Sequence, residues 1–388
     1  MTTDVFIQGD SVVCGLGVGS EQVADALFAD ALPDLDVARL IDGRTVPISS
    51  VDLNAHELMR ESGIPESRNN RLAKIALDCL PHRAKDIVSA TVPDRLGIVI
   101  GTSTSGIGDA GDAMTRFVKD GRWPSNFELS MQELGDPALF IARQVGAQGP
   151  TYAVSTACTS SAKAIISAAR MIKQGLCDTV ICGGVDTVCD MTLNGFGVLE
   201  ALSQERCKPF SRNRSGIHIG EGGALFVLTA QPSAVRVSGW GESSDAHHIS
   251  APDPEGHGAR IAMSSALQMA GRTPDEIGYI NLHGTATVQN DLMEAGAVHG
   301  LFGDTTPCSS TKPLTGHTLG AAGAIEAAFV AHAIKRRRLP RNRNDGENDP
   351  GLANIQLLES DADFAGAAAM SCNYAFGGNN TALVLEPT

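Results

Sequence analysis

Residues 151–162 read TYAVSTACTSSA, and this stretch determines where the chain places its most reactive side chain. Its first four residues are mostly β-branched or aromatic, which predicts a buried strand. A turn of small residues follows, and residues 161–172 have the alanine and isoleucine spacing of a helix. The thiol of Cys158 therefore lies between a strand and a helix. Because unpaired N–H groups at a helix start stabilise an anion, we expect the pKa of this thiol to fall toward neutral pH.

Taken alone, Cys158 is either a nucleophile or a small buried cysteine, as most free cysteines are. Two later segments favour the nucleophile. His283 ends a short apolar strand, and residues 309–324 read SSTKPLTGHTLGAAGA, which places Lys312 and His317 in a loop before an alanine-rich helix. A cysteine, two histidines and a lysine at such junctions predict an acyl-transfer site.

A third segment, residues 373–380, reads NYAFGGNN and precedes the last expected strand, residues 382–386. Its flexible backbone would allow an N–H group to face a ligand. An ordinary hairpin turn is the alternative, and the spacing alone does not decide between them.

These segments, in this order, resemble the condensing enzymes of the thiolase superfamily, and most of all the β-ketoacyl-acyl carrier protein synthases of the KAS I/II type. The resemblance covers essentially the whole chain, from the glycines of residues 9–19 to the turn at Phe376. It implies an α/β protein with the thiolase fold, in which two similar halves form alternating α-β-α-β-α layers. We expect the halves to be residues 1–230, with the nucleophile, and 234–388, with both histidines and the lysine. No repeat is visible in the sequence itself.

The resemblance also assigns roles to individual residues. It implies that both imidazoles donate hydrogen bonds to an enolate, so a partner should hold the other nitrogen of each ring. Glu294 is expected to organise Lys312 and its loop, although a surface ion pair is the alternative for each of these two residues. The assigned residues are Cys158, His283, His317, Lys312 and Glu294 for catalysis, the N–H groups of Cys158 and Phe376 for the oxyanion hole, and Thr285 and Thr287 for the pantetheine arm.

The implied activity is that of a 3-oxoacyl-acyl carrier protein synthase, an acyltransferase. It joins a malonyl unit to a cysteine-bound acyl group with loss of carbon dioxide. Both substrates arrive on the 4'-phosphopantetheine of a carrier protein, so no separate cofactor is expected. Asp245, His247, His248 and His257 lie in a loop with irregular spacing, which favours a structural or channel role over a metal site.

The expected partners are an acyl carrier protein and a second subunit. Arg68 and Arg71 align with the residues that receive the carrier in the family, and Lys74 lies one helical turn further on. A solvated charged face is the alternative. The strand at residues 152–156 typically pairs across a two-fold axis in the family, which predicts a homodimer or a heterodimer with a chain-length-factor-like subunit.

Composition agrees with this interpretation. The 388 residues are 43% hydrophobic, enough for a large core, and the net charge of −14 argues against nucleic acid. Nine cysteines without a CxxC pair suit the cytosol. The start lacks a signal-like apolar region, and the apolar residues 321–334 are too few for a membrane span and include Glu326. We expect a soluble cytoplasmic enzyme.

Strands and helices are predicted to alternate, as in sheets covered by helices. The expected strands are residues 96–101, 179–183, 224–228 and 367–370; the expected helices are 138–145, 162–173 and 322–334, and residues 336–350 are an expected surface loop.

Some positions depart from the family pattern. Ala375 replaces a glycine before Phe376, residues 288–290 read VQN instead of Pro-Val-Gly, and residues 211–218 differ from the usual Asp-x-x-Arg-Asp-Gly-Phe. These changes spare the assigned catalytic residues and suggest a specialised substrate, with a ketosynthase of an aryl polyene or related polyene pathway as the alternative. A non-catalytic chain-length partner would lack Cys158, a thiolase would need a second cysteine in the final turn, and a chalcone-type enzyme would use Cys-His-Asn.

Overall fold

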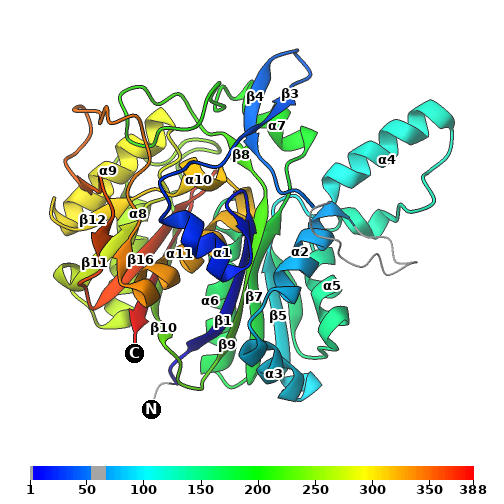
Figure 1. The fold of residues 1–388 in the computed structure, drawn as a ribbon, viewed down its shortest axis with the longest axis horizontal. Coiled ribbons are helices and arrows are strands. Elements are labelled where there is room, and N and C mark those ends of the chain that lie inside the picture. Colours follow the sequence, from blue (N-terminus) through cyan, green and yellow to red (C-terminus); the bar gives the residue numbers. More distant parts are fainter. Residues whose placement is uncertain (1–2, 54–66) are drawn as a thin grey trace.

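The computed structural model describes residues 3–53 and 67–388, and its first half is built on a mixed sheet (Figure 1). The strand order is β6-β5-β7-β9-β1. Strand β5 runs parallel to β6 and β7, and β9 runs antiparallel to β7 and β1. The bounds are β1 (Phe6–Cys14), β5 (Leu96–Gly101), β6 (Thr151–Val154), β7 (Thr179–Asp186) and β9 (Gly222–Thr229).

The second half repeats this arrangement strand for strand. Its order is β12-β11-β16-β17-β10, with β11 parallel to β12 and β16, and β17 antiparallel to β16 and β10. The bounds are β10 (Val235–Ser244), β11 (Ile277–Asn281), β12 (Pro307–Ser309), β16 (Ala368–Tyr374) and β17 (Asn379–Pro387). The duplication that the sequence hides is therefore visible in the topology. The two halves join where β1 pairs with β10 at Phe6 and Arg236.

Two helices in equivalent positions form the middle layer. Helix α6 (Ser160–Lys173) follows β6, and α11 (Ala322–Arg336) follows β12. One hydrophobic core contains both helices and strands of both halves. The helices approach closely because their facing residues are small: a Cβ on Gly323 would lie 2.8 Å from the Cβ of Ala162. This explains why both segments are rich in alanine on all sides.

The outer layers complete the α-β-α-β-α arrangement. Helices α2 (Arg68–Asp78), α3 (His82–Ala90) and α5 (Asp136–Val145) pack on the outer face of the first sheet. Helices α8 (His257–Ala270) and α9 (Val288–Phe302) cover the second sheet. The fold is therefore the expected thiolase fold.

The remaining elements are shorter or peripheral. Helix α4 projects from the body of the molecule (Figure 1). In the part of the chain that the structure describes, no helix is long and apolar enough to cross a membrane. The bounds are α1 (Ser20–Leu27), α4 (Ile107–Asp120), α7 (Asp190–Val198), α10 (Lys312–Thr315), β2 (Gly17–Val18), β3 (Asp36–Arg39), β4 (Thr45–Ser49), β8 (Ile219–Gly220), β13 (Arg338–Leu339), β14 (Gln356–Leu357) and β15 (Ala362–Asp363), with 3-10 turns at η1 (Pro93–Arg95), η2 (Leu129–Gln132), η3 (Pro274–Glu276) and η4 (Leu319–Ala321).

The predicted strands and helices are confirmed, with ends that differ by a few residues, but two predictions about exposure are wrong. Strand β6 was expected to be buried, yet it is an edge strand and the side chain of Tyr152 is 39% exposed. An edge strand has a neighbour on one side only, so hydrophobic pattern alone does not reveal its exposure. The expected surface loop at residues 336–350 contains strand β13, and Leu339 and Asn342 within it are buried.

Candidate active site

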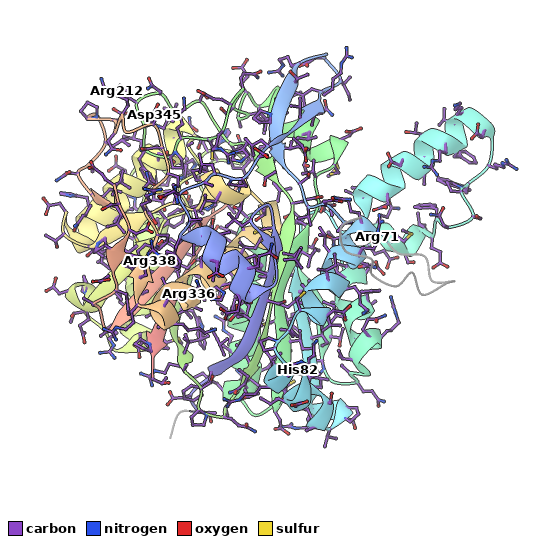
Figure 2. All side chains as sticks on the ribbon, in the orientation of Figure 1. Arg71, His82, Arg212, Arg336, Arg338 and Asp345 are labelled. Carbon is purple, nitrogen blue, oxygen red and sulfur yellow. The ribbon has the colours of Figure 1, made fainter. Side chains whose placement is uncertain are left out.

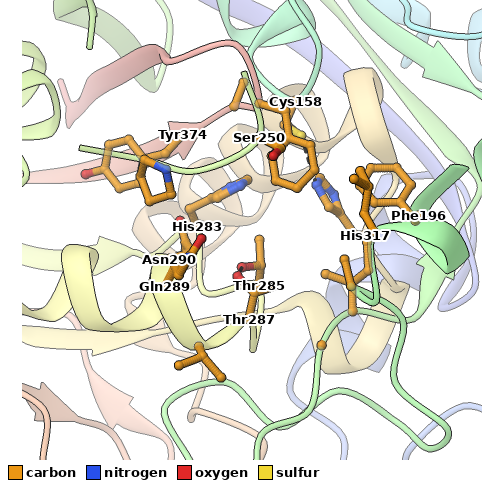
Figure 3. Close-up of a pocket in the computed structure, with 18 of the residues that line it drawn as sticks. Cys158, Phe196, Ser250, His283, Thr285, Thr287, Gln289, Asn290, His317 and Tyr374 are labelled. Carbon is orange, nitrogen blue, oxygen red and sulfur yellow. Dashed lines mark hydrogen bonds between the residues drawn. The ribbon is translucent and has the colours of Figure 1, made fainter. Parts of the chain in front are cut away.

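Cys158 lies in the turn between β6 and α6, two residues before the helix begins (Figure 3). Ala157, the residue before it, has a left-handed backbone with φ of 52°. The hydroxyl of Ser160 accepts a hydrogen bond from the N–H of Thr156 and donates one to the carbonyl of Ala157, which closes the turn. The local sequence therefore folds into a tight turn that directs the sulfur away from the strand.

The prediction that the pKa of Cys158 falls toward neutral is wrong. Only 6% of the residue is exposed, and burial raises the pKa of the thiol to about 11. The positive charge of Lys312 and the backbone N–H groups of Phe376 and Cys158 act in the opposite direction. Desolvation of the thiolate outweighs them. The helix-start prediction neglected this burial, which only the tertiary structure creates.

Both assigned histidines approach the sulfur. The Nε2 atom of His317 lies 3.0 Å from the Sγ of Cys158, and the rings of His283 and His317 are 5.4 Å apart and nearly perpendicular. Figure 3 shows both imidazoles directed into the space below Cys158. Burial, followed by the charge of Lys312, lowers the pKa of each imidazole well below its usual value. Both rings are therefore neutral at physiological pH.

Lys312 sets the protonation of His283. Its ammonium nitrogen lies 3.2 Å from Nδ1 of His283 and 2.5 Å from the carbonyl oxygen of that residue. Because an ammonium group only donates, Nδ1 accepts and the ring proton is on Nε2. The expected hydrogen-bond partner of the second ring nitrogen is thus present for His283. It is absent for His317, because Nδ1 of that ring has no hydrogen-bond partner among the described residues.

Glu294 organises the loop but not the lysine. Its carboxylate accepts the N–H groups of His283 and Gly284 at 2.6 and 2.7 Å, and burial raises its pKa to about 8. The carboxylate that pairs with Lys312 is Glu326, at 2.5 Å, on the buried helix α11. Sequence reasoning missed this role. The available signal was a single acidic residue within an otherwise apolar helix, since such a charge needs a buried partner.

A cavity of about 450 Å³ opens onto the sulfur. Thr285 and Thr287 line it and their hydroxyl oxygens lie 2.9 Å apart. Residues that depart from the family pattern, Gln289, Asn290 and Ala375, also line it. Sequence reasoning did not single out Phe196, whose ring packs 5.5 Å from that of Phe376 in the cavity wall.

His248 lies in the loop after β10 as expected, but His257 does not, because it is the first residue of α8. Nδ1 of His257 lies 2.8 Å from a carboxylate oxygen of Asp253, and Nδ1 of His248 accepts the N–H of Ser250 at 3.1 Å. Over residues 3–53 and 67–388, the only three potential metal-ligand side chains whose donor atoms lie within 4.8 Å of one another are Cys158, His283 and His317.

The expected docking residues have different surroundings. The guanidinium of Arg68 binds both carboxylate oxygens of the buried Glu221, and 33% of its side chain remains exposed, so its role in carrier docking stays a prediction. Lys74 pairs with Asp78 at 2.6 Å. Arg71 is exposed, and Figure 2 labels it on α2, on the side of the molecule that carries α4.

The fold and this site together define a condensing enzyme with a Cys-His-His arrangement. Sequence models of the family agree: the model of the "Beta-ketoacyl synthase, N-terminal domain" matches residues 83–234, and the model of the "Beta-ketoacyl synthase, C-terminal domain" matches residues 234–345. The chain belongs to the β-ketoacyl synthase family, as the resemblance predicted.

Individual relatives extend over most of the chain. The 3-oxoacyl-[acyl-carrier-protein] synthase 2 of Staphylococcus aureus is 32% identical over 341 residues, which cover 82% of this chain and 84% of that protein. Among solved structures, the ketosynthase ApeO in complex with its chain length factor ApeC from Xenorhabdus doucetiae matches with a TM-score of 0.91 and 39% identity, over 100% of this chain and 98% of that one. A beta-ketoacyl synthase from Burkholderia phymatum STM815 matches over the whole of both chains with a TM-score of 0.86 and 26% identity.

The two arginines of α2 should differ in their effect on stability. Arg68→Gln is expected to lower the free energy of unfolding by about 1–3 kcal/mol, because the buried carboxylate of Glu221 loses its charged partner. The exposed Arg71→Gln is the matched control and should change it by less than about 0.5 kcal/mol. Urea unfolding of both variants measures the difference, and equal stabilities would contradict the structural role of Arg68.

The buried ion pair should tune the reactivity of Cys158 in opposite directions. The charge of Glu326 raises the pKa of the thiol and that of Lys312 lowers it. Below pH 10 the thiolate fraction is small, so the rate of alkylation by iodoacetamide reports that pKa. At pH 9, Glu326→Gln should react faster than the wild-type protein and Lys312→Met more slowly, as measured by peptide mass spectrometry at Cys158. Shifts of the same sign would contradict this electrostatic account.

Proposed function

We propose that this protein is a 3-oxoacyl-acyl carrier protein synthase that joins a malonyl unit to a cysteine-bound acyl group. The observation that supports this most is the contact of 3.0 Å between Nε2 of His317 and the Sγ of Cys158, beside a second neutral imidazole and a buried ammonium. Cys158, His283 and His317 come from distant parts of the chain and line one cavity.

In the first half of the reaction, the sulfur of Cys158 attacks the thioester carbon of an acyl group on phosphopantetheine. The new C–S bond forms, the bond to the pantetheine sulfur breaks, and the proton of the thiol leaves with the pantetheine thiol. The N–H of His317 stabilises the developing thiolate. The N–H groups of Cys158 and Phe376, which act on the sulfur in the free enzyme, stabilise the tetrahedral oxyanion, and losing one such donor typically costs about 3 kcal/mol.

In the second half, malonyl carrier protein enters and its terminal carboxylate leaves as carbon dioxide. The electron pair of the broken C–C bond becomes an enolate. The Nε2–H groups of His283 and His317 donate hydrogen bonds to its thioester oxygen. The enolate carbon then attacks the acyl carbonyl, and Cys158 leaves as a thiolate. Lys312 and Glu294 are positioning residues here, because one fixes the tautomer of His283 and the other fixes its backbone.

The cavity suits a pantetheine arm. Thr285 and Thr287 line it with their hydroxyl groups 2.9 Å apart, and Phe196 and Phe376 line it with their rings packed on each other. The reaction as proposed needs no further cofactor. The cytoplasmic location expected from the free thiols remains a prediction. The expected bounds of the two halves, residues 1–230 and 234–388, also remain a prediction.

The proposed partners are an acyl carrier protein and a second subunit. The docking residues proposed on α2 are Arg68, Arg71 and Lys74, of which Arg71 is exposed and the other two are partly buried. The second subunit would cover the edge strand β6 and the exposed apolar side chains of α4 and η2, because Met114, Val118 and Leu129 are at least half exposed. The likeness to a ketosynthase that is bound to a chain length factor favours an unlike partner over a second copy.

A specialised substrate is the second candidate. The residues that depart from the family pattern, Gln289, Asn290 and Ala375, line the cavity instead of lying elsewhere on the surface. This placement supports the alternative of a polyene pathway, in which the acyl group is conjugated or aryl-capped.

Two substitutions test the mechanism with carrier-bound substrates. Cys158→Ala should abolish the acyl-enzyme that intact mass spectrometry detects, because no nucleophile remains. His317→Ala should retain more acyl transfer than condensation. The reason is that the hydrogen bond from Nε2–H of His317 to the enolate is needed only in the second half of the reaction. Chain extension by Cys158→Ala, or an equal loss of both steps in His317→Ala, would contradict the assigned roles.

The same assay with a panel of acyl carrier proteins distinguishes the two candidate substrates. Loading of Cys158 by saturated chains supports fatty-acid synthesis, and loading only by conjugated or aryl-capped chains supports the polyene pathway.

The subunit composition can be measured directly. Expressed alone, the chain should aggregate or associate through its apolar surface, and co-expression with a chain-length-factor partner should give a 1:1 complex by light scattering. A stable homodimer with full condensing activity would contradict the unlike partner. A stable monomer would contradict both forms of assembly.

A further inference from the structure

Asp186 is a fully buried carboxylate that the mechanism above does not use. It is the last residue of β7 and is 0% exposed. No arginine, lysine or histidine of the described residues forms an ion pair with it. Burying a carboxylate without a cation is costly unless hydrogen bonds replace its hydration. A chain retains such a group where it has a structural or functional purpose.

Hydrogen bonds from two separate loops satisfy this carboxylate. The first loop, residues 102–104, follows β5 and donates to it through the hydroxyl of Thr102 at 2.6 Å, the N–H of Ser103 at 2.8 Å, and the N–H and hydroxyl of Thr104 at 2.9 and 2.8 Å. The second loop donates through the N–H of Gly320 at 2.6 Å, from the other half of the molecule.

Each of these two loops is connected to one of the two contacting residues, Cys158 or His317. The N–H of Thr102 binds the carbonyl of Val154 at the end of β6, and the hydroxyl of Ser103 reaches the carbonyl of Ala157, immediately before Cys158. Gly320 lies three residues after His317. Asp186 therefore connects the turn that contains Cys158 to the turn that follows His317, across the boundary between the two halves.

Backbone strain is present at both connections. Ala157 and Leu319 have φ of 52°, a left-handed conformation that is unfavourable for residues with a side chain. Such strain persists only where the surroundings hold it. A Cβ on Gly320 would lie 2.6 Å from the carboxylate oxygen Oδ2 and 2.6 Å from the hydroxyl of Ser103, so the second loop is closely seated against the first.

We infer that Asp186 is a positioning residue, which holds the loop after His317 against the loop beside Cys158 and so maintains the contact between imidazole and sulfur. The consequence for turnover rests on the proposed function. The consequence for the reactivity of the thiol is independent of the proposed function, because alkylation of Cys158 needs no carrier protein or acyl substrate.

Asp186→Asn is a sharp test, because it keeps the size of the side chain. Its remaining oxygen can still accept the donors of residues 102–104, whereas its NH₂ group faces the N–H of Gly320, where two donors repel. The expected result is about a tenfold slower alkylation of Cys158 by iodoacetamide at pH 8, equivalent to an upward shift of one unit in the pKa of the thiol. Turnover should fall by about 10- to 100-fold, with the KM for acyl carrier protein changed by less than about threefold.

Two further variants separate positioning from stability. Asp136→Asn alters another buried carboxylate, which binds Asn70 at 2.6 Å away from the cavity, and should leave the alkylation rate at the wild-type value even where the melting temperature falls. Gly320→Ala opens the same connection from its other side and should reproduce the slow alkylation, which covers the case in which Asp186→Asn does not fold.

The outcomes are distinguishable. Wild-type alkylation rates in both Asp186→Asn and Gly320→Ala would overturn the inference, and so would an equal loss in Asp136→Asn. Slow alkylation in the first two variants, together with a wild-type protein that does not condense any carrier-bound substrate, would support the positioning role and refute the proposed function.

Discussion

The close packing of α6 against α11 is the constraint on which the site depends. Both helices lie between the two sheets, and small residues at their contact, Ala162 and Gly323, let the backbones approach. The N–H of Ala324 donates to the hydroxyl of Ser161 at 2.8 Å, which fixes the two helix starts relative to each other. Because Cys158 precedes one helix and His317 precedes the other, this packing brings the sulfur and the imidazole together.

The duplicated topology explains why chemically different groups converge. Cys158 follows β6 and His317 follows the equivalent strand β12, while His283 and the turn of Phe376 follow β11 and β16. In each half the carboxyl ends of parallel strands meet at one edge of the sheet, where loops of an α/β protein form binding sites. The residues that follow these strands meet, because Nε2 of His317 lies 3.0 Å from the Sγ of Cys158. One half therefore supplies the cysteine and the other supplies the two imidazoles of the proposed site.

One buried ion pair and the burial of the site set the protonation states of its reactive groups. Lys312 and Glu326 form a buried ion pair, and the ammonium of Lys312 contacts Nδ1 of His283. The contact of Lys312 fixes the tautomer of His283, and burial together with the charge of Lys312 keeps both imidazoles neutral, each with one N–H group available to donate. Burial also explains why the thiol is not ionised in advance, since the environment that strengthens these hydrogen bonds disfavours an isolated thiolate.

The sequence by itself determined the strand–turn–helix around Cys158, the junction positions of His283 and His317, and the alanine-rich helices of the middle layer, because these depend on local spacing and residue type. It did not determine the exposure of Tyr152, the pairing of Arg68 with Glu221, or the choice of Glu326 over Glu294 as the partner of Lys312. Each of these depends on which distant segment packs against the residue. The tertiary structure alone decided them, because burial and long-range pairing set the free energy of a charge more strongly than its neighbours along the chain do.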